Sequence, residues 1–324
     1  MTNEVSFECL KPHERDFFVS RISCGYYYID LNGQKLKFVH PNKRISLLAN
    51  QVYMDSFNEC INKTISEKAI LDLIISEFGW NYANEEFLEE YPSLAKDIKI
   101  KLFQNMYNPI LKMNLKKELK ELAKEYSRLY NIKNTFHYMT PHGIADANKW
   151  HFIINNCVYN NKREKQKYIF QKSKIVTNLV LSEYLTDSIL RNIANNEPWS
   201  SIWYASEGKD IFAGKVCDYN SEQIRLISWS KMYQNIRMSN NPPSEDVIED
   251  DDILDGWMAI SSMEREKERN IATAEGRITN KKIRGSQEVF VPVSSKEEAK
   301  HIQSLNTASN KMKQKEMIEK LKGS

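Results

Sequence analysis

The sequence predicts a mainly α-helical protein that consists of helical hairpins and a bundle, a small N-terminal β-hairpin and an extended C-terminal helical tail. Apolar residues recur at helical spacing through most of the chain. A clear strand signal with a tight-turn dipeptide occurs around residues 24–40. Beyond about residue 262 the chain becomes polar, and its apolar residues are too sparse for an independent core.

The length of 324 residues favours more than one domain. We expect a β-hairpin plus helical domain over 1–160 and a helical domain with a Trp-rich cluster and an acidic loop over 161–262. The polar helical tail then covers 263–324. The first of these boundaries is placed at a polar and basic break, NNKREKQK, near 160–166.

Composition excludes several classes of protein. Charged residues make up 27% of the chain but nearly balance at +3, which argues against a protein dominated by nucleic-acid contacts. No apolar run is long enough to predict a membrane span. The first residues are acidic and polar where a signal peptide needs a basic end and an apolar run. The five scattered cysteines do not form a disulfide framework, so we expect a cytoplasmic protein.

The strand signal is a hairpin pattern. The aromatic run Tyr26–Tyr28 precedes Asn32 and Gly33, and Leu36, Phe38 and Val39 follow them. An Asn-Gly pair favours a type I′ turn because both turn residues need positive φ. A two-stranded hairpin is marginal alone, so its apolar face should pack on a neighbour.

Helical spacing begins at about residue 43. We expect a second helix that begins after Ser66 and ends at Gly79, a natural stop. A short helix should begin near Asn84. Pro92 fits the first turn of the next helix, which should end at Pro109.

The segment 112–131 has the most regular pattern in the chain. Its apolar residues alternate steps of four and three, as in a heptad seam: Leu115, Leu119, Leu122, Tyr126 and Leu129. The seam covers little more than two heptads, so we expect an antiparallel helical hairpin, with 143–159 as the partner helix.

One apolar helix is expected over roughly 168–194. The aromatic cluster that follows should form a packed core, with an exposed binding patch as the alternative: Trp199, Trp203, Tyr204, Phe212, Tyr219, Trp229 and Tyr233. The last helix should begin at Ser295, where Glu298 completes a capping box. Its sparse apolar stripe, which includes Ile302, Leu305 and Ile318, should dock on a neighbour or a partner.

Catalytic and cofactor motifs are absent from the sequence. No glycine-rich phosphate loop, GxSxG, HExxH or paired CxxC occurs, so we expect no enzymatic activity and no cofactor. His137, His142, His151 and Cys157 are residue types that bind zinc, but their spacing fits no standard site. We interpret them as ordinary side chains near a helix boundary and predict no metal.

The acidic run 245–255 allows three interpretations. It contains Glu245, Asp246, Glu249, Asp250, Asp251, Asp252 and Asp255. Carboxylates at a helix N-terminus are stabilised by the helix dipole, and this cap or surface role is our first interpretation. The alternatives are a docking site for a basic partner and a cation site, although the EF-hand spacing fails.

The basic face of 112–131 supports a second functional hypothesis. Its cations could contact nucleic acid: Lys112, Lys116, Lys117, Lys120, Lys124 and Arg128. Glu118, Glu121 and Glu125 interleave with them, which is typical of a solvated helix face. We therefore regard nucleic acid as an unlikely partner and keep a nucleic-acid-associated protein as the alternative.

Several phrases across the chain resemble proteins encoded in the structural-gene clusters of tailed bacteriophages. They are GYYYIDLNGQKLKFVHP, TFHYMTPHGIA, EPWSSIW, PPSEDVIEDDDILDGW and GSQEVFVPVSSKEEAKHIQSLN. None is a catalytic signature. The resemblance implies a role in building the tail or another virion part, as an assembly chaperone or a minor structural component. It also implies phage structural or tail proteins as partners, and a location in the host cytoplasm or the virion.

We therefore expect a protein that acts by protein–protein contacts, without crossing a membrane. The expected partner-binding residues come from the seam, the acidic run and its flank, and the tail: Leu115, Leu119, Leu122, Tyr126, Leu129, Asp250, Asp251, Asp252, Trp257, Ile302, Leu305 and Ile318. An enzyme whose active site is assembled from distant residues is the third class left open.

Overall fold

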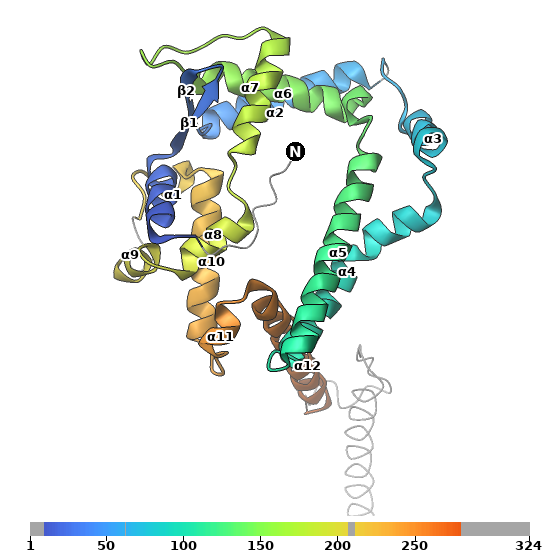
Figure 1. Ribbon diagram of the computed structural model, residues 1–324, viewed down its shortest axis with the longest axis vertical. Coiled ribbons are helices and arrows are strands. Elements are labelled where there is room, and N and C mark those ends of the chain that lie inside the picture. The colour runs from blue at the N-terminus through green and yellow to red at the C-terminus, as the bar shows by residue number, and fades with distance from the viewer. Residues whose placement is uncertain (1–9, 62, 207–210, 280–324) are drawn as a thin grey trace, which may run out of the picture. The chain divides into compact units, whose positions relative to one another are not determined.

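The computed structural model describes residues 10–61, 63–206 and 211–279 of the chain. Helices dominate this part of the protein, and one small antiparallel sheet includes the N-terminal hairpin, so the predicted fold class is confirmed (Figure 1). The predicted tail beyond residue 279 lies outside the described residues. The chain divides into two compact units, with Lys96–Leu115 and the residues from Asp252 onward in the second.

The helices follow the hydrophobic pattern of the sequence. In chain order they are α1 (Pro12–Cys24), α2 (Lys43–Cys60), α3 (Glu67–Phe78), α4 (Tyr82–Gln104), α5 (Pro109–Lys133), α6 (Pro141–Cys157), α7 (Phe170–Ser182), α8 (Asp187–Asn195), α9 (Trp199–Ala205), α10 (Ser221–Arg237), α11 (Glu245–Ile248) and α12 (Asp251–Thr279). Short 3₁₀ turns, η1 (His137–Met139) and η2 (Val216–Asp218), precede α6 and α10.

The hairpin forms as its turn dipeptide predicts. Strands β1 (Tyr26–Leu31) and β2 (Gln34–Val39) pair in antiparallel register, and the turn between them has φ of 53° at Asn32 and 81° at Gly33. Positive φ at both positions is the requirement of a type I′ turn. A third strand, β3 (Val158–Tyr159), extends the sheet beside β2 and was not predicted.

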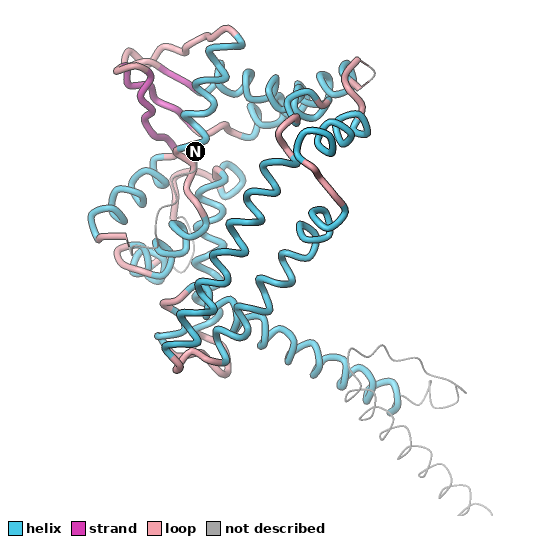
Figure 2. Tube along the Cα trace, turned by 45° about the vertical axis from the view of Figure 1, so that its right-hand side comes forward, coloured by secondary structure: helices cyan, strands magenta, loops and turns pink. Residues whose placement is uncertain are grey.

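One face of the sheet forms a hydrophobic core in the first unit. Alternate strand residues, including Ile29, Leu36 and Phe38, pack with apolar residues of α6 and α7. The α6 helix also packs along α2, and Figure 2 shows these helices beside the strands. This core supplies the neighbour that a hairpin needs for stability.

Two helix boundaries differ from the prediction. Pro92 lies inside the continuous helix α4 instead of starting a new one. The expected helix over 168–194 is two helices, α7 and α8, separated near Glu183–Thr186. Side chains far away in the sequence satisfy the backbone at this break, because Arg21 donates to the carbonyl of Glu183 and the N–H of Leu185 donates to Glu222. A local pattern does not contain such contacts.

The partner of α5 is α4 rather than the segment 143–159. The rings of Tyr91 and Tyr126 stack at 4.1 Å, and Lys133 forms an ion pair with Glu85. Leu129 packs in a core cluster with Ile70, Ile74 and Trp80. The prediction that 143–159 forms the other half of this hairpin is therefore wrong, because α6 instead packs on α2, α7 and η1.

The aromatic cluster mainly forms a packed core, as its density predicts. Trp199, Trp203, Phe212 and Tyr233 are buried, and the Trp199 and Phe212 rings stack at 5.5 Å. The indole N–H of Trp199 donates to Ser230 at 2.8 Å. Burying an aromatic ring while satisfying its polar atom is the favourable arrangement.

The second unit contains the end of α4, the start of α5 and most of α12. Gly256 lets the α12 backbone approach α4 closely, because a Cβ there would lie 2.0 Å from the carbonyl oxygen of Lys99. Leu102 and Leu254 are fully buried. The chain passes from one unit to the other after residues 95, 115 and 251, and none of these positions is near residue 160. The helices on either side of residue 160, α6 and α7, pack together.

Candidate functional site

The first unit contains a buried ionic cluster of Arg21, His40 and Glu222. Arg21 comes from α1, His40 follows β2, and Glu222 lies in the first turn of α10. The Arg21 Nη2 atom is 3.1 Å from Oε1 of Glu222, and His40 Nε2 is 3.3 Å from Oε2. All three side chains are at most 5% exposed. Such charges are stable inside a protein only when they are paired and hydrogen-bonded.

The surroundings favour the charged form of Glu222. Burial alone would raise the pKa of its carboxyl group, but the hydrogen bond from His40 and the charge of Arg21 outweigh burial and hold the pKa below its ordinary value. The backbone N–H of Leu185 also donates to Oε1. The Arg21 guanidinium lies 4.1 Å from the centre of the Tyr27 ring, so its planar face is covered as well.

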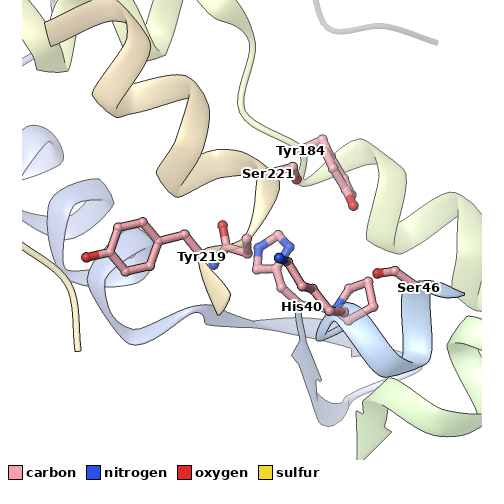
Figure 3. A pocket seen from close by; sticks show the side chains of 8 residues that line it. His40, Ser46, Tyr184, Tyr219 and Ser221 are labelled. Atoms are coloured by element: carbon pink, nitrogen blue, oxygen red, sulfur yellow. The ribbon is translucent and has the colours of Figure 1, made fainter. Parts of the chain in front are cut away.

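A cavity of about 140 Å³ lies beside this cluster. Its lining comes from the starts of α2 and α10 and from the segment between α7 and α8: His40, Pro41, Lys43, Ser46, Tyr184, Tyr219, Asn220 and Ser221. Figure 3 shows the His40 ring near the centre, with Tyr184 and Ser46 on the same side and the Tyr219 ring turned away. The Tyr219 hydroxyl donates to the carbonyl of Phe212.

The cluster connects separate segments of the first unit. Oε1 of Glu222 accepts from Arg21 and from the backbone N–H of Leu185, and Oε2 lies 3.3 Å from His40 Nε2. A nucleophile must lie within hydrogen-bond reach of its base, and within the described chain no serine hydroxyl makes such a contact with His40. What the cluster does is join α1, β2, the α7–α8 connection and α10.

A serine and a histidine do meet elsewhere, between α6 and α7. Ser173 Oγ lies 2.7 Å from Nδ1 of His151, but the hydroxyl donates its proton to the carbonyl of Phe170. Its oxygen therefore accepts from the imidazole, which is the reverse of a nucleophile activated by a base. Ser173 is also buried at 2% exposure.

The zinc-type residues of 137–157 have separate surroundings. His142 contacts the Tyr53 hydroxyl and the Phe57 ring, whereas His137 is 3.7 Å from Asp146. Cys157 lies in the sheet core, where burial raises the pKa of its thiol to about 12. Among the described residues no group of three or more potential metal ligands converges.

The predicted seam lies along α5 and is mostly half-buried. Leu129 is buried, whereas Leu115, Leu119, Leu122 and Tyr126 are intermediate in exposure. The contacts of Tyr126 and Leu129 are with α3 and α4 and the residues next to them. At least this end of the seam therefore serves internal packing of the first unit.

The acidic run caps helices and forms ion pairs within each unit. Helix α11 starts at Glu245 and α12 at Asp251, which agrees with carboxylates at helix N-termini. In the first unit Asp250 pairs with Lys116 at 2.6 Å and Asp251 with Arg191 at 2.9 Å. In the second, Lys99 lies between Asp252 at 3.1 Å and Asp255 at 2.6 Å.

The remaining predicted partner-binding residues are not brought together. Trp257 is half-buried on α12 in the second unit. Ile302, Leu305 and Ile318 lie outside the described residues, so their predicted role stays a prediction.

Sequence reasoning did not find the buried cluster. Arg21 and Glu222 are 201 positions apart, and neither lies in a charge run. Sequence reasoning also did not single out α3, which is apolar on several sides. Ile70 and Ile74 are buried, but Leu71, Ile75 and Phe78 are 43–46% exposed. The segment AILDLIISEF signals this directly, because seven of its ten positions are apolar.

No helix in the described chain has both the length and the apolar character that a membrane crossing requires. No protein-family model, curated protein or solved structure matches this chain.

Proposed function

We propose that the protein is a non-enzymatic assembly factor of a tailed-phage virion, either a chaperone or a minor structural component, that works through protein–protein contacts. The observation that carries this proposal is the exposed apolar face of α3. The phage setting comes from the sequence resemblance, and the contact surface comes from the fold.

The exposed face of α3 is a continuous stripe. Leu71, Ile75 and Phe78 follow the i, i+4, i+7 spacing that places side chains on one side of a helix. Another side of the same helix buries Ile70 and Ile74 in the core, so α3 has more apolar surface than its own core covers. Contiguous exposed apolar surface of this kind is typical of protein interaction sites.

The helix-in-groove mode of recognition suits this surface. A partner that supplied an apolar groove would cover the stripe through three successive anchors. The second unit offers a separate apolar surface at the α4–α5 turn, where Tyr107 is 83%, Ile110 69% and Met113 65% exposed. Two such surfaces suit a protein that holds other chains.

The acidic run supports the proposal less than its composition suggests. Asp250, Asp251 and Asp252 have cationic partners within their own units, so binding a basic partner there would require exchange of existing ion pairs. The seam likewise contributes to the α4–α5 packing. The α3 stripe needs no such exchange.

The test is complementation of a phage that lacks this gene, with the wild-type protein or the double variant Leu71→Asp/Ile75→Asp. Both positions are exposed, so the variant should keep its helical circular dichroism and thermal midpoint. We expect particle yield, counted by electron microscopy, to fall at least about tenfold because two charges in an apolar contact are costly.

The control is Ser76→Asp, which places one negative charge at an exposed polar position of α3, where the double variant places two on the stripe. It should support normal yield. Normal yield from the double variant would reject α3 as the working surface. If the wild-type protein turned over a substrate, the non-enzymatic assignment would be wrong. A change in oligomeric state of the double variant would identify a second copy as the occupant of the stripe.

A further inference from the structure

We propose that the solvent face of the small sheet binds single-stranded nucleic acid, with tyrosine rings stacking on bases and basic side chains contacting phosphates. The surface consists of a row across the strands, Tyr28, Lys37, Tyr159 and Lys165, and of the neighbouring cations Lys35, Lys162, Arg163 and Lys167. This site does not depend on the assembly role proposed above.

Backbone pairing places the row on one face. Tyr28 lies opposite Lys37, Lys37 opposite Tyr159, and Tyr159 opposite Lys165. Residues paired directly across strands project from the same side of a sheet. Their neighbours Tyr27, Phe38 and Val158 are buried in the core, which assigns the row to the other side.

The row is aromatic and exposed at Tyr28 and Lys165, whereas Lys37 and Tyr159 are half-buried. The Tyr28 side chain is 57% exposed, and its ring meets the Tyr26 ring edge-on at 5.9 Å. Neighbouring strands are about 4.8 Å apart, so the row spans roughly 14 Å. Small sheets with exposed aromatic side chains typically stack two or three bases in this way.

The charge around the row is net positive. The hairpin and the α6–α7 connection carry Lys35, Lys37, Lys162, Arg163, Lys165 and Lys167. None of these six side chains forms an ion pair anywhere in the described chain. The two nearby acids are occupied in turns, because Asp30 accepts from the N–H of Gly33 and Glu164 accepts from the Asn160 amide.

The basic connection lies beside the aromatic residues. The bridge between Tyr159 and Lys165 fixes the connection along the sheet, and Figure 2 shows this loop next to the strands. Lys37 Nζ lies 3.4 Å from the centre of the Tyr26 ring, so a cation and an aromatic face are already in contact. Phosphates and bases alternate along a single strand, and a surface of alternating cations and rings complements them.

The ligand class follows from the combination. Cations alone would suit any polyanion, including duplex DNA, an anionic membrane or an acidic protein. Exposed tyrosines among the cations favour a ligand with unpaired bases, because such bases can stack on the rings. The nucleic-acid hypothesis based on α5 used cations that are largely paired, as in Arg128 with Glu125 and Lys116 with Asp250. The six cations of the sheet face, by contrast, form no ion pair within the described chain, and they lie beside the exposed Tyr28 ring.

The experiment measures fluorescence anisotropy of a labelled oligothymidylate of about twenty nucleotides with the purified full chain, and repeats it with duplex DNA of equal length. We expect tighter binding of the single strand. Tyr28→Ala should weaken binding roughly tenfold, whereas Tyr28→Phe should bind like the wild type because the ring remains. Lys37→Ala/Lys165→Ala should weaken binding and reduce the slope of log affinity against log salt by about 1.4, since each lost phosphate contact removes about 0.7.

The matched control is Lys120→Ala/Lys124→Ala, which removes the same charge from exposed positions of α5. It should bind like the wild type, and all variants should share one thermal midpoint. If the control pair lost as much affinity as the sheet pair, binding would depend on α5 or on net charge rather than on the sheet face, and the proposal would fail. It would also fail if Tyr28→Ala had no effect, if duplex bound as well as single strand, or if phosphatidylserine vesicles or polyglutamate displaced the oligonucleotide at equal charge. Absence of binding by the wild type at low salt would reject it outright.

Discussion

The buried cluster of Arg21, His40 and Glu222 and the acidic run 245–255 are both sets of ion pairs, but they differ in burial. In the cluster, every side chain is at most 5% exposed. In the Lys116–Asp250 pair, the lysine is 43% and the aspartate 17% exposed. Water competes with the second kind of pair and is largely excluded from the first. Removing one partner of the exposed Lys116–Asp250 pair should therefore cost less stability than removing Glu222 from the buried cluster.

The largest effect should come from breaking the buried cluster. Glu222→Ala leaves Arg21 buried without its carboxylate, and loss of one partner of a buried pair costs about 3–5 kcal/mol. Urea denaturation should show this decrease in the free energy of unfolding. The control is Glu183→Gln, which removes the half-exposed carboxylate beside Arg21 and should cost about 1 kcal/mol or less. An equal decrease in the free energy of unfolding in the two variants would show that burial of the carboxylate does not determine its contribution to stability.

Lowering the pH should have an intermediate effect on the stability of the folded protein. The pKa of Glu222 is lowered in the folded protein, so its contribution to stability is present above the unfolded value and is lost as pH falls through the folded pKa. The stability of the wild type should therefore decrease more steeply below about pH 4.5 than that of Glu222→Gln, which has no carboxyl group to protonate there. Thermal melts between pH 3 and 7 would measure the difference. Parallel curves would contradict the lowered pKa.

The smallest effect should come from the acidic run. Lys116→Ala removes one partner of Asp250 at a site that water reaches, so we expect a loss of about 0–1 kcal/mol. High salt should reduce even this difference. If Lys116→Ala lowered the free energy of unfolding as much as Glu222→Ala in the same urea assay, the exposed pair would be as important for stability as the buried cluster, and the comparison would be wrong.

Local signals predicted most of the fold. The Asn32-Gly33 turn forms because the dipeptide itself favours positive φ. Ser66 and Gly79 mark the ends of α3 because capping depends on neighbouring residues. The helix α1 gave no comparable signal, since its apolar residues do not gather on one face, and it was not predicted.

Features that depend on distant residues could not be predicted. The break between α7 and α8 is satisfied by Arg21 and Glu222, which a window around residue 184 does not contain. The third strand has two residues and exists through its pairing with β2. For the same reason the row on the sheet was missed, because Tyr28 and Lys165 come onto one face of the same sheet only after β3 joins the hairpin.

The separation of Arg21 from Glu222 has a consequence for synthesis. The two residues are 201 positions apart. A ribosome that adds about 5–20 residues per second would complete Glu222 roughly 10–40 s after Arg21. During that interval the Arg21 guanidinium lacks its buried carboxylate partner, and the break after α7 lacks one of its two satisfying side chains. Closure of the first unit is therefore a late, non-local step, and a nascent chain stalled before α10 should expose its hairpin and α1 to chaperones and proteases.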